Sequence, residues 1–216
     1  GHANFGQLTN AYTAPTDFNA LSTANIPEPT ISPNEVEQAD DHFNTILYTG
    51  NASPAEHAIG FRPNLVWGKK RGTAAQNHWL LNDVTNINKR MSADNTDSEQ
   101  SDADGTTFNA NGSFTTANND LYINNNSPYV VWAWKGNGTG TATSNTAGSI
   151  NSTVSVNEAA GFSIVSYTGT GANATVGHGI GIAPRMIIMK NRDSSQNWVV
   201  YHEEIGNDRE ILLNTT

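Results

Sequence analysis

The segment FNTILYTG at residues 43–50 decides the fold, because it recurs as FSIVSYTG at residues 162–169. Aromatic and β-branched residues are frequent in both segments, and each ends in Tyr-Thr-Gly, which is typical of a strand that closes in a turn. The shared pattern therefore predicts the same strand at two places in the chain.

The similarity between the two regions extends well beyond this strand. After a short loop, GFRPNLVWGK at residues 60–69 aligns with GIAPRMIIMK at residues 181–190. Further on, NHWLL at residues 77–81 aligns with QNWVV at residues 196–200. The same order of strand and turn signals thus occurs twice, and we name the two regions copy one and copy two.

The distance between the copies indicates a duplicated domain. It is 119 residues from Tyr48 to Tyr167 and 121 residues from Pro63 to Pro184, whereas the repeats of solenoid proteins are about 20 to 50 residues long. We therefore expect two copies of one fold, in which these tyrosines and these prolines superpose.

Each copy contains short apolar runs separated by turn residues, without helical periodicity. In copy one, the runs at residues 64–67 and 77–81 precede a closing strand at residues 127–135, SPYVVWAWK. Many short strands without intervening helices predict an all-β fold of tandem antiparallel β-sandwich or jelly-roll units. Trp132 and Trp134 share one face of the closing strand, and we expect that face to be the buried one.

The predicted organisation has four parts, which are residues 1–42, 43–136, 137–160 and 161–216. They are an N-terminal segment with a linker, copy one, a linker rich in Gly, Asn, Thr and Ser, and copy two. The low apolar content of the linker region predicts that residues 136–153 are exposed and extended. Copy two lacks a counterpart of the closing strand, so we expect the natural protein to continue past Thr216.

Composition and charge exclude several classes of partner. Twenty acidic residues against 11 basic ones give a formal net charge of -9, which disfavours binding to nucleic acid. The chain has no cysteine, so disulfides and thiolate metal sites are excluded. No apolar run reaches the roughly 18 residues of a membrane span, and the first ten residues lack the features of a signal peptide. We expect no membrane partner.

The motifs resemble the tandem repeats of structural and tail-appendage proteins from marine bacteriophages. HGIGIAP at residues 178–184 and KNR at residues 190–192 fit that repeat, whereas HAIG at residues 57–60 shortens its glycine turn. NFGQ at residues 4–7 and YTAPTDF at residues 12–18 are similar to the end of a SPRY-like (concanavalin-like) domain. The resemblance covers nearly the whole chain and implies concanavalin-like or laminin-G-like sandwiches.

The resemblance also implies a function. It points to a virion structural or adhesion protein, such as a tail fibre, a spike or a capsid-surface appendage, located on the virion and therefore extracellular. The implied partners are other virion proteins, copies of the chain in a homo-oligomer, and a glycan or receptor on the host surface. A bacterial extracellular adhesin or filament subunit is the alternative. A polysaccharide-degrading enzyme is disfavoured because neither an activated nucleophile nor a matched acid pair is visible, and we expect no catalysis and no cofactor.

Three residues are candidates for ligand binding. The indole rings of Trp79 and Trp198 could stack on a sugar, but their equivalent positions within apolar runs favour a place in the core. His178 lies between glycines and could polarise a bond. No nucleophile or partner carboxylate accompanies the histidine, so we expect no catalysis there. Because no helix-forming segment follows the glycines, a glycine-permitted turn is a better interpretation than a phosphate-binding loop.

The candidates for a metal site are Asp94, Asp97, Asp102 and Asp104. Their carboxylates supply the hard oxygens that calcium prefers, but the spacing lacks the bidentate glutamate of a calcium loop, so we expect a solvated loop and no metal. Glutamates at residues 203–204 form an adjacent pair. Adjacent residues of a strand point to opposite faces, so we do not expect this pair to flank a glycosidic bond.

Overall fold

The computed structural model describes residues 37–72, 76–101, 105–116 and 122–215. Residues 1–38 and residues 39–216 form separate units, and the predicted end of a SPRY-like domain lies outside the described residues. The all-β prediction is confirmed, because the described residues form antiparallel strands with two three-residue 3-10 helices, Ala39–Asp41 (η2) and Glu203–Ile205 (η3). No helix in this part of the chain is long and apolar enough to cross a membrane.

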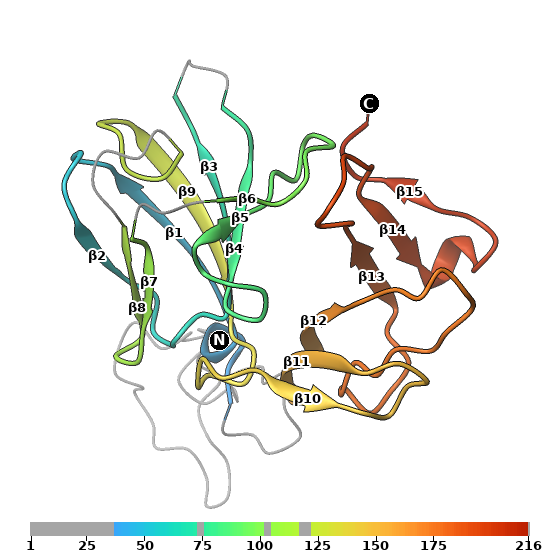
Figure 1. Ribbon diagram of the computed structural model, residues 1–216. Helices are drawn as coiled ribbons and strands as arrows, with labels where there is room; N and C mark the ends of the chain where they lie inside the picture. The colour runs from blue at the N-terminus through green and yellow to red at the C-terminus, as the bar shows by residue number, and fades with distance from the viewer. Residues whose placement is uncertain (1–36, 73–75, 102–104, 117–121, 216) are drawn as a thin grey trace, which may run out of the picture. The chain divides into compact units, whose positions relative to one another are not determined.

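Copy one folds into two antiparallel sheets that pack on each other (Figure 1). The first has the order β1-β9-β3-β4 and contains Phe43–Thr49 (β1), Pro128–Trp134 (β9), Leu65–Lys70 (β3) and Trp79–Asn82 (β4). The second has the order β2-β8-β7 and contains Ala55–Ala58 (β2), Ser113–Thr116 (β8) and Thr107–Asn109 (β7). Lys89–Arg90 (β5) and Gln100–Ser101 (β6) form a small ribbon.

β9 is central in the first sheet because it pairs with both β1 and β3. Its side chains alternate as a pleated strand requires: Tyr129, Val131 and Ala133 are buried, and the residues between them are more exposed. Trp132 and Trp134 therefore lie on the outer face, and the prediction that they occupy the buried face is wrong. Val131 and Ala133 belong to the core cluster between the sheets, whereas the indole rings of Trp132 and Trp134 contact the rings of Trp67 and Phe43 on the outer face.

The core of copy one contains Trp79, whose side chain is fully buried. Phe108 and Phe114 of the second sheet belong to the same cluster. Gly68 pairs with Trp79 across β3 and β4, and a Cβ on Gly68 would lie 1.9 Å from the indole ring. The ring fits here because this position of β3 has no side chain, and burial of a tryptophan stabilises a fold by on the order of 4 kcal/mol.

The segment after copy one and copy two together form two further antiparallel sheets of three strands each. The first has the order β10-β11-β12 and consists of Thr143–Asn145 (β10), Ser152–Asn157 (β11) and Phe162–Tyr167 (β12). The second has the order β13-β14-β15 and consists of Met186–Met189 (β13), Val199–His202 (β14) and Ile211–Leu212 (β15). The strands that open copy two and carry its apolar run are thus present where the sequence places them.

The segment at residues 137–160 contains secondary structure, in contrast to the extended linker expected there. β10 and β11 lie within it and pair with each other, and β11 also pairs with β12. The backbone N–H of Asn137 donates to Ser155 Oγ at 3.0 Å, and Ser152 Oγ donates to the Gly177 carbonyl at 2.6 Å. Side-chain hydroxyls and amides hold the backbone here, where apolar contacts are few.

The β3–β4 and β13–β14 hairpins correspond in the two copies, but their registers differ by one residue. Gly68 pairs with Trp79, whereas its counterpart Met189 pairs with Val199 and not with Trp198. The indole of Trp79 leaves no room for a side chain at the Gly68 position. Because Met189 takes that position in copy two, Trp198 cannot pack as Trp79 does. A one-residue slip turns side chains to the opposite face of a sheet.

Trp198 instead joins copy two to copy one. Its ring is 4% exposed and its Nε1 donates to the Ser92 carbonyl at 2.7 Å. It belongs to a buried cluster with three residues of copy one, Leu80, Met91 and Ala93. A second link is an ion pair, in which Arg192 Nε and Nη2 donate to Glu99 Oε1 and Oε2 at 3.0 and 2.8 Å. These contacts account for the grouping of both copies in one compact unit.

Candidate functional site

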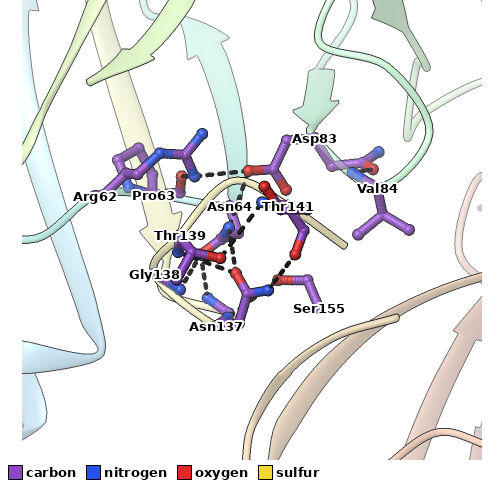
Figure 2. A network of polar contacts seen from close by, with 12 residues as sticks. Arg62, Pro63, Asn64, Asp83, Val84, Asn137, Gly138, Thr139, Thr141 and Ser155 are labelled. Carbon is purple, nitrogen blue, oxygen red and sulfur yellow. Dashed lines mark hydrogen bonds and ion pairs between the residues drawn. The ribbon is translucent and has the colours of Figure 1, made fainter. Parts of the chain in front are cut away.

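Asn64 is the centre of a buried polar network at one end of the first sheet. It directly precedes β3 and is fully buried. Its Nδ2 donates to Asp83 Oδ2 at 2.9 Å, and its Oδ1 accepts from the backbone N–H groups of Gly136 at 2.8 Å and Gly138 at 3.0 Å. One side chain therefore fixes the loop before β3, the loop after β4 and the segment after β9 (Figure 2).

Asn137 extends this network to β11, which lies in the segment between the copies. Besides the bond from its backbone N–H to Ser155 of β11, its Nδ2 donates to the Thr141 carbonyl at 2.7 Å. Its Oδ1 accepts from the backbone N–H of Thr139 at 3.1 Å and from Asn64 Nδ2 at 3.3 Å. The loop at residues 137–141 is closed by these bonds, as Figure 2 shows.

Arg62 and Asp83 form the charged part of the site. Arg62 Nη1 donates to Asp83 Oδ2 at 2.7 Å, and the two side chains are 15% and 9% exposed. Their opposite charges balance within one mostly buried pair. Asp83 Oδ1 is buried and has no hydrogen-bond partner in the described part of the chain. One carboxylate oxygen therefore keeps the capacity to accept a hydrogen bond.

An open pocket of about 410 Å³ adjoins this ion pair and is lined by Arg62, Asp83, Asn86, Ile87, Thr107, Phe108 and Gly140. Gly140 has a φ of 77°, and a Cβ on it would lie 2.2 Å from Arg62 Nη2, so a side chain at this position would displace the guanidinium. The wall combines amide, hydroxyl and guanidinium groups with an aromatic ring. Because the charges of the pair balance, the pocket suits a small neutral ligand with hydroxyl groups better than an anion.

Shifted pKa values occur in copy one outside the pocket. Burial lowers the pKa of His57, and it lowers the pKa of His78 against the opposing attraction of Asp94. A hydrogen bond from Ser113 lowers the pKa of the Glu56 carboxyl. None of these groups lines the pocket, so they influence the stability of the sandwich more directly than they influence ligand binding.

The three candidates for ligand binding lie outside the pocket. Trp79 is fully buried and Trp198 is 4% exposed, so neither ring offers a face on which a sugar could stack. His178 is half-buried, and its Nδ1 accepts a hydrogen bond from the backbone N–H of Ile180 at 3.2 Å. Gly179 has a φ of 80°, so the histidine belongs to a turn that glycine permits.

The acidic candidates for a metal site form local hydrogen bonds. Asp94 Oδ1 accepts from the backbone N–H of His78 at 3.0 Å, and Asp97 Oδ2 accepts from Asn95 Nδ2 at 2.9 Å. The described residues contain no cluster of three or more metal-ligating side chains. The other two candidates, Asp102 and Asp104, lie outside the described residues.

Glu203 and Glu204 lie in η3 and not in a strand, so the expectation that was based on strand geometry is wrong for them. β14 ends at His202, whose Nδ1 accepts from the backbone N–H of Glu204 at 3.3 Å. This cap begins the short helix. Glu203 Oε1 accepts from Arg185 Nε at 2.9 Å, so its carboxylate belongs to a surface ion pair.

Arg62, which lines the pocket, and Asn64, which binds Asp83 beside it, were not among the residues expected from the sequence to bind a ligand. They are replaced in copy two by Ala183 and Arg185. The signal that could have found them is this difference within an otherwise matching motif. Asp83 belongs to the same site but lies beyond the aligned segments, so only the folded hairpin brings it to Arg62.

The fold and this network define an all-β sandwich protein with a pocket of mixed polar and apolar lining at one end of its first sheet. The chain belongs to the family described as "Domain of unknown function (DUF7483)", which it matches over residues 38–216. The match therefore runs through both copies and the segment between them. No curated protein and no solved structure matches the chain.

Proposed function

We propose that this chain is a non-enzymatic structural and adhesion module of a virion appendage, such as a tail fibre, a spike or a capsid-surface protein. The resemblance of its motifs to the repeats of marine-bacteriophage structural proteins supports this proposal. The structural observation that carries it is the packing of copy two on copy one through Trp198 and the pair of Arg192 with Glu99. Fixed contacts between successive units suit a part that must project from a particle.

The stability of this arrangement is consistent with an exposed location. The chain has no cysteine, so its stability depends on two apolar clusters and on buried side-chain amides such as Asn64. The hydrogen bonds of Asn64 to the backbone N–H groups of Gly136 and Gly138 hold these loops without disulfides. Stability of this kind does not depend on the redox conditions around the protein, which suits an appendage outside a cell.

The pocket at Arg62 and Asp83 supports the adhesive part of the proposal. Its hydrogen-bonding groups and the ring of Phe108 match the mixture of hydroxyl groups and apolar edges on a neutral sugar. A net charge of -9 opposes anionic ligands. One open pocket gives weak binding, and a homo-oligomer raises the avidity by offering several pockets at once.

A panel of neutral oligosaccharides and host cell-surface polysaccharides tests this adhesion. The biotinylated chain, presented as a streptavidin tetramer, is expected to bind at least one member of the panel much more strongly than the monomer does. Thr107→Lys places a long charged side chain at the pocket wall and is expected to weaken binding at least tenfold. The matched control is Thr49→Lys, at an exposed threonine of β1 that does not line the pocket.

Three outcomes would contradict parts of this proposal. Equal losses in the two lysine variants would show that the pocket is not the binding site. The absence of binding to the whole panel would reject adhesion and leave the architectural role. The virion location is tested by mass spectrometry of purified particles, where recovery of the chain only from bacterial envelopes, without capsid and tail proteins, would reject it.

A further inference from the structure

β13 is an apolar edge strand that is exposed along its whole length. Its four residues, Met186 to Met189, are 52%, 37%, 41% and 39% exposed. β13 pairs with β14 on one side, and no described strand pairs with its other side. Edge strands usually carry charges or irregularities that prevent further pairing, and β13 has neither in its four residues.

The equivalent strand of copy one, β3, shows which kind of strand pairs with this edge. By the sequence match, β3 corresponds to β13, β4 to β14 and β1 to β12. In copy one, β3 pairs with β4 on one side and with β9 on the other, and β9 continues the sheet to β1. In copy two, β12 and β13 belong to different sheets, and each is an edge strand. The free side of β13 therefore corresponds to the side of β3 that β9 occupies.

We propose that the free edge of β13 binds an added antiparallel strand of the β9 type, which joins β13 to β12 in one sheet. The strand is an uncharged segment of about seven residues with aliphatic or aromatic side chains at alternate positions, as in Tyr129, Val131 and Ala133. Such strand addition combines main-chain hydrogen bonds with burial of alternate side chains. It would cover the methionines and isoleucines of β13.

The occupant is a polypeptide segment that is not among residues 37–215. β9 itself is excluded, because β1 and β3 already pair with its two edges. β1 and β3 are held in the first sheet by their pairing with β9, and β2, β7 and β8 contain only three or four residues. A second copy of the chain that pairs β13 with β13 is a different occupant, and the experiment below separates it.

A peptide with the sequence of residues 127–135, SPYVVWAWK, is the probe. The labelled peptide is expected to bind the chain saturably in fluorescence anisotropy, and backbone amides of β13 are expected to exchange with solvent at least tenfold more slowly in the complex. A peptide of scrambled order and one with Val131→Pro are expected to bind at least tenfold more weakly, because they lose the alternation or the central hydrogen bonds.

Variants of the chain test the location. Ile188→Lys places a charge in the middle of β13 and is expected to weaken peptide binding at least tenfold. Ile182→Lys is the matched control, because Ile182 is 71% exposed and lies outside the strand. Circular dichroism shows whether each variant folds, and Val131→Pro in the peptide tests the same pairing without altering the protein.

Several results would overturn the proposal. These are equal binding of the three peptides, equal effects of the two lysine variants, or exchange protection in β1 and β3 instead of β13, which would indicate replacement of the native β9. A dimer of the chain without peptide that Ile188→Lys converts to a monomer would identify a second copy as the occupant. None of these results bears on the pocket at Asp83, so this proposal can fail while the proposed adhesion stands.

Discussion

The packing of Trp79 depends on a single residue of β3, Gly68. The indole ring lies where a side chain at Gly68 would otherwise be, since a Cβ there would lie 1.9 Å from it. We expect Gly68→Ala to lower the free energy of unfolding by about 3 kcal/mol, because a close-packed core resists an added methyl group. Gly72→Ala is the control, where the nearest atom is 3.9 Å from the Cβ position and the expected change is within about 0.5 kcal/mol.

Chemical denaturation measures both glycine variants. The Gly68 variant is expected to unfold at a lower denaturant concentration with an unchanged slope. Equal stability of the two variants would mean that Trp79 can leave its position at little cost. The reading of Gly68 as the reason for the different registers of the two hairpins would then fail.

His57 gives the sandwich a pH dependence. Its ring contacts those of Tyr48 and Phe114 at centroid distances of 4.0 and 5.0 Å, and burial lowers its pKa below the ordinary value of 6.5. The unfolded chain therefore takes up a proton at a higher pH than the folded chain does. The stabilisation from neutral His57 is complete above about pH 6.5 and is lost as the pH falls toward the folded pKa, by at most about 1.4 kcal/mol per pH unit.

Thermal or denaturant unfolding between pH 7.5 and pH 5 checks this expectation. Burial lowers the pKa of His78 in the same direction, so the double variant His57→Gln, His78→Gln should show a flatter profile than the parent chain. Glu56 has a lowered carboxyl pKa and contributes its own change mainly below pH 4.5, which is outside this range. An unchanged slope in the double variant would contradict the assignment.

At the scale of strands and sheets, the positions of the main strands of copy one agree with the sequence pattern. The strand at residues 43–49, the hairpin partners of copy one and the closing strand were all expected, because alternation and turn residues depend on local sequence. The sequence did not predict which face of β9 turns inward, because both faces carry apolar residues. The choice depends on how Val131 and Ala133 fit against the second sheet, which is information from distant segments.

The candidate site was less accessible to sequence reasoning than the strands were. Asn64, Asp83 and Asn137 lie in three different loops, and their mutual hydrogen bonds require the first sheet to be formed. The same holds for residues 137–160, whose composition resembles that of a linker although β10 and β11 pair there. The low apolar content of a segment shows that apolar burial contributes little to its folding. It does not show how many backbone N–H and C=O groups will form hydrogen bonds with buried amide and hydroxyl side chains.

At the scale of the whole unit, the central question is whether copies one and two unfold together. Two independent sandwiches on an extended linker would melt separately, whereas contacts that both copies share couple their unfolding. Trp198 provides such a contact because burial of its ring depends on residues of copy one. The carboxylate of Glu99 provides another, since its side chain is 11% exposed and it binds Arg192 at two points.

We therefore expect the described unit to unfold in a single calorimetric transition, and Glu99→Gln to move that whole transition to lower temperature. The loss should be about 1 kcal/mol, because Arg192 is partly exposed and water compensates part of the broken pair. Glu203→Gln is the matched control, since Glu203 pairs with Arg185, whose side chain is 82% exposed. It should change the stability by less than about 0.5 kcal/mol. Two separate transitions, of which Glu99→Gln shifts only one, would show that the copies are independent and that the contacts of Trp198 and Glu99 do not couple them.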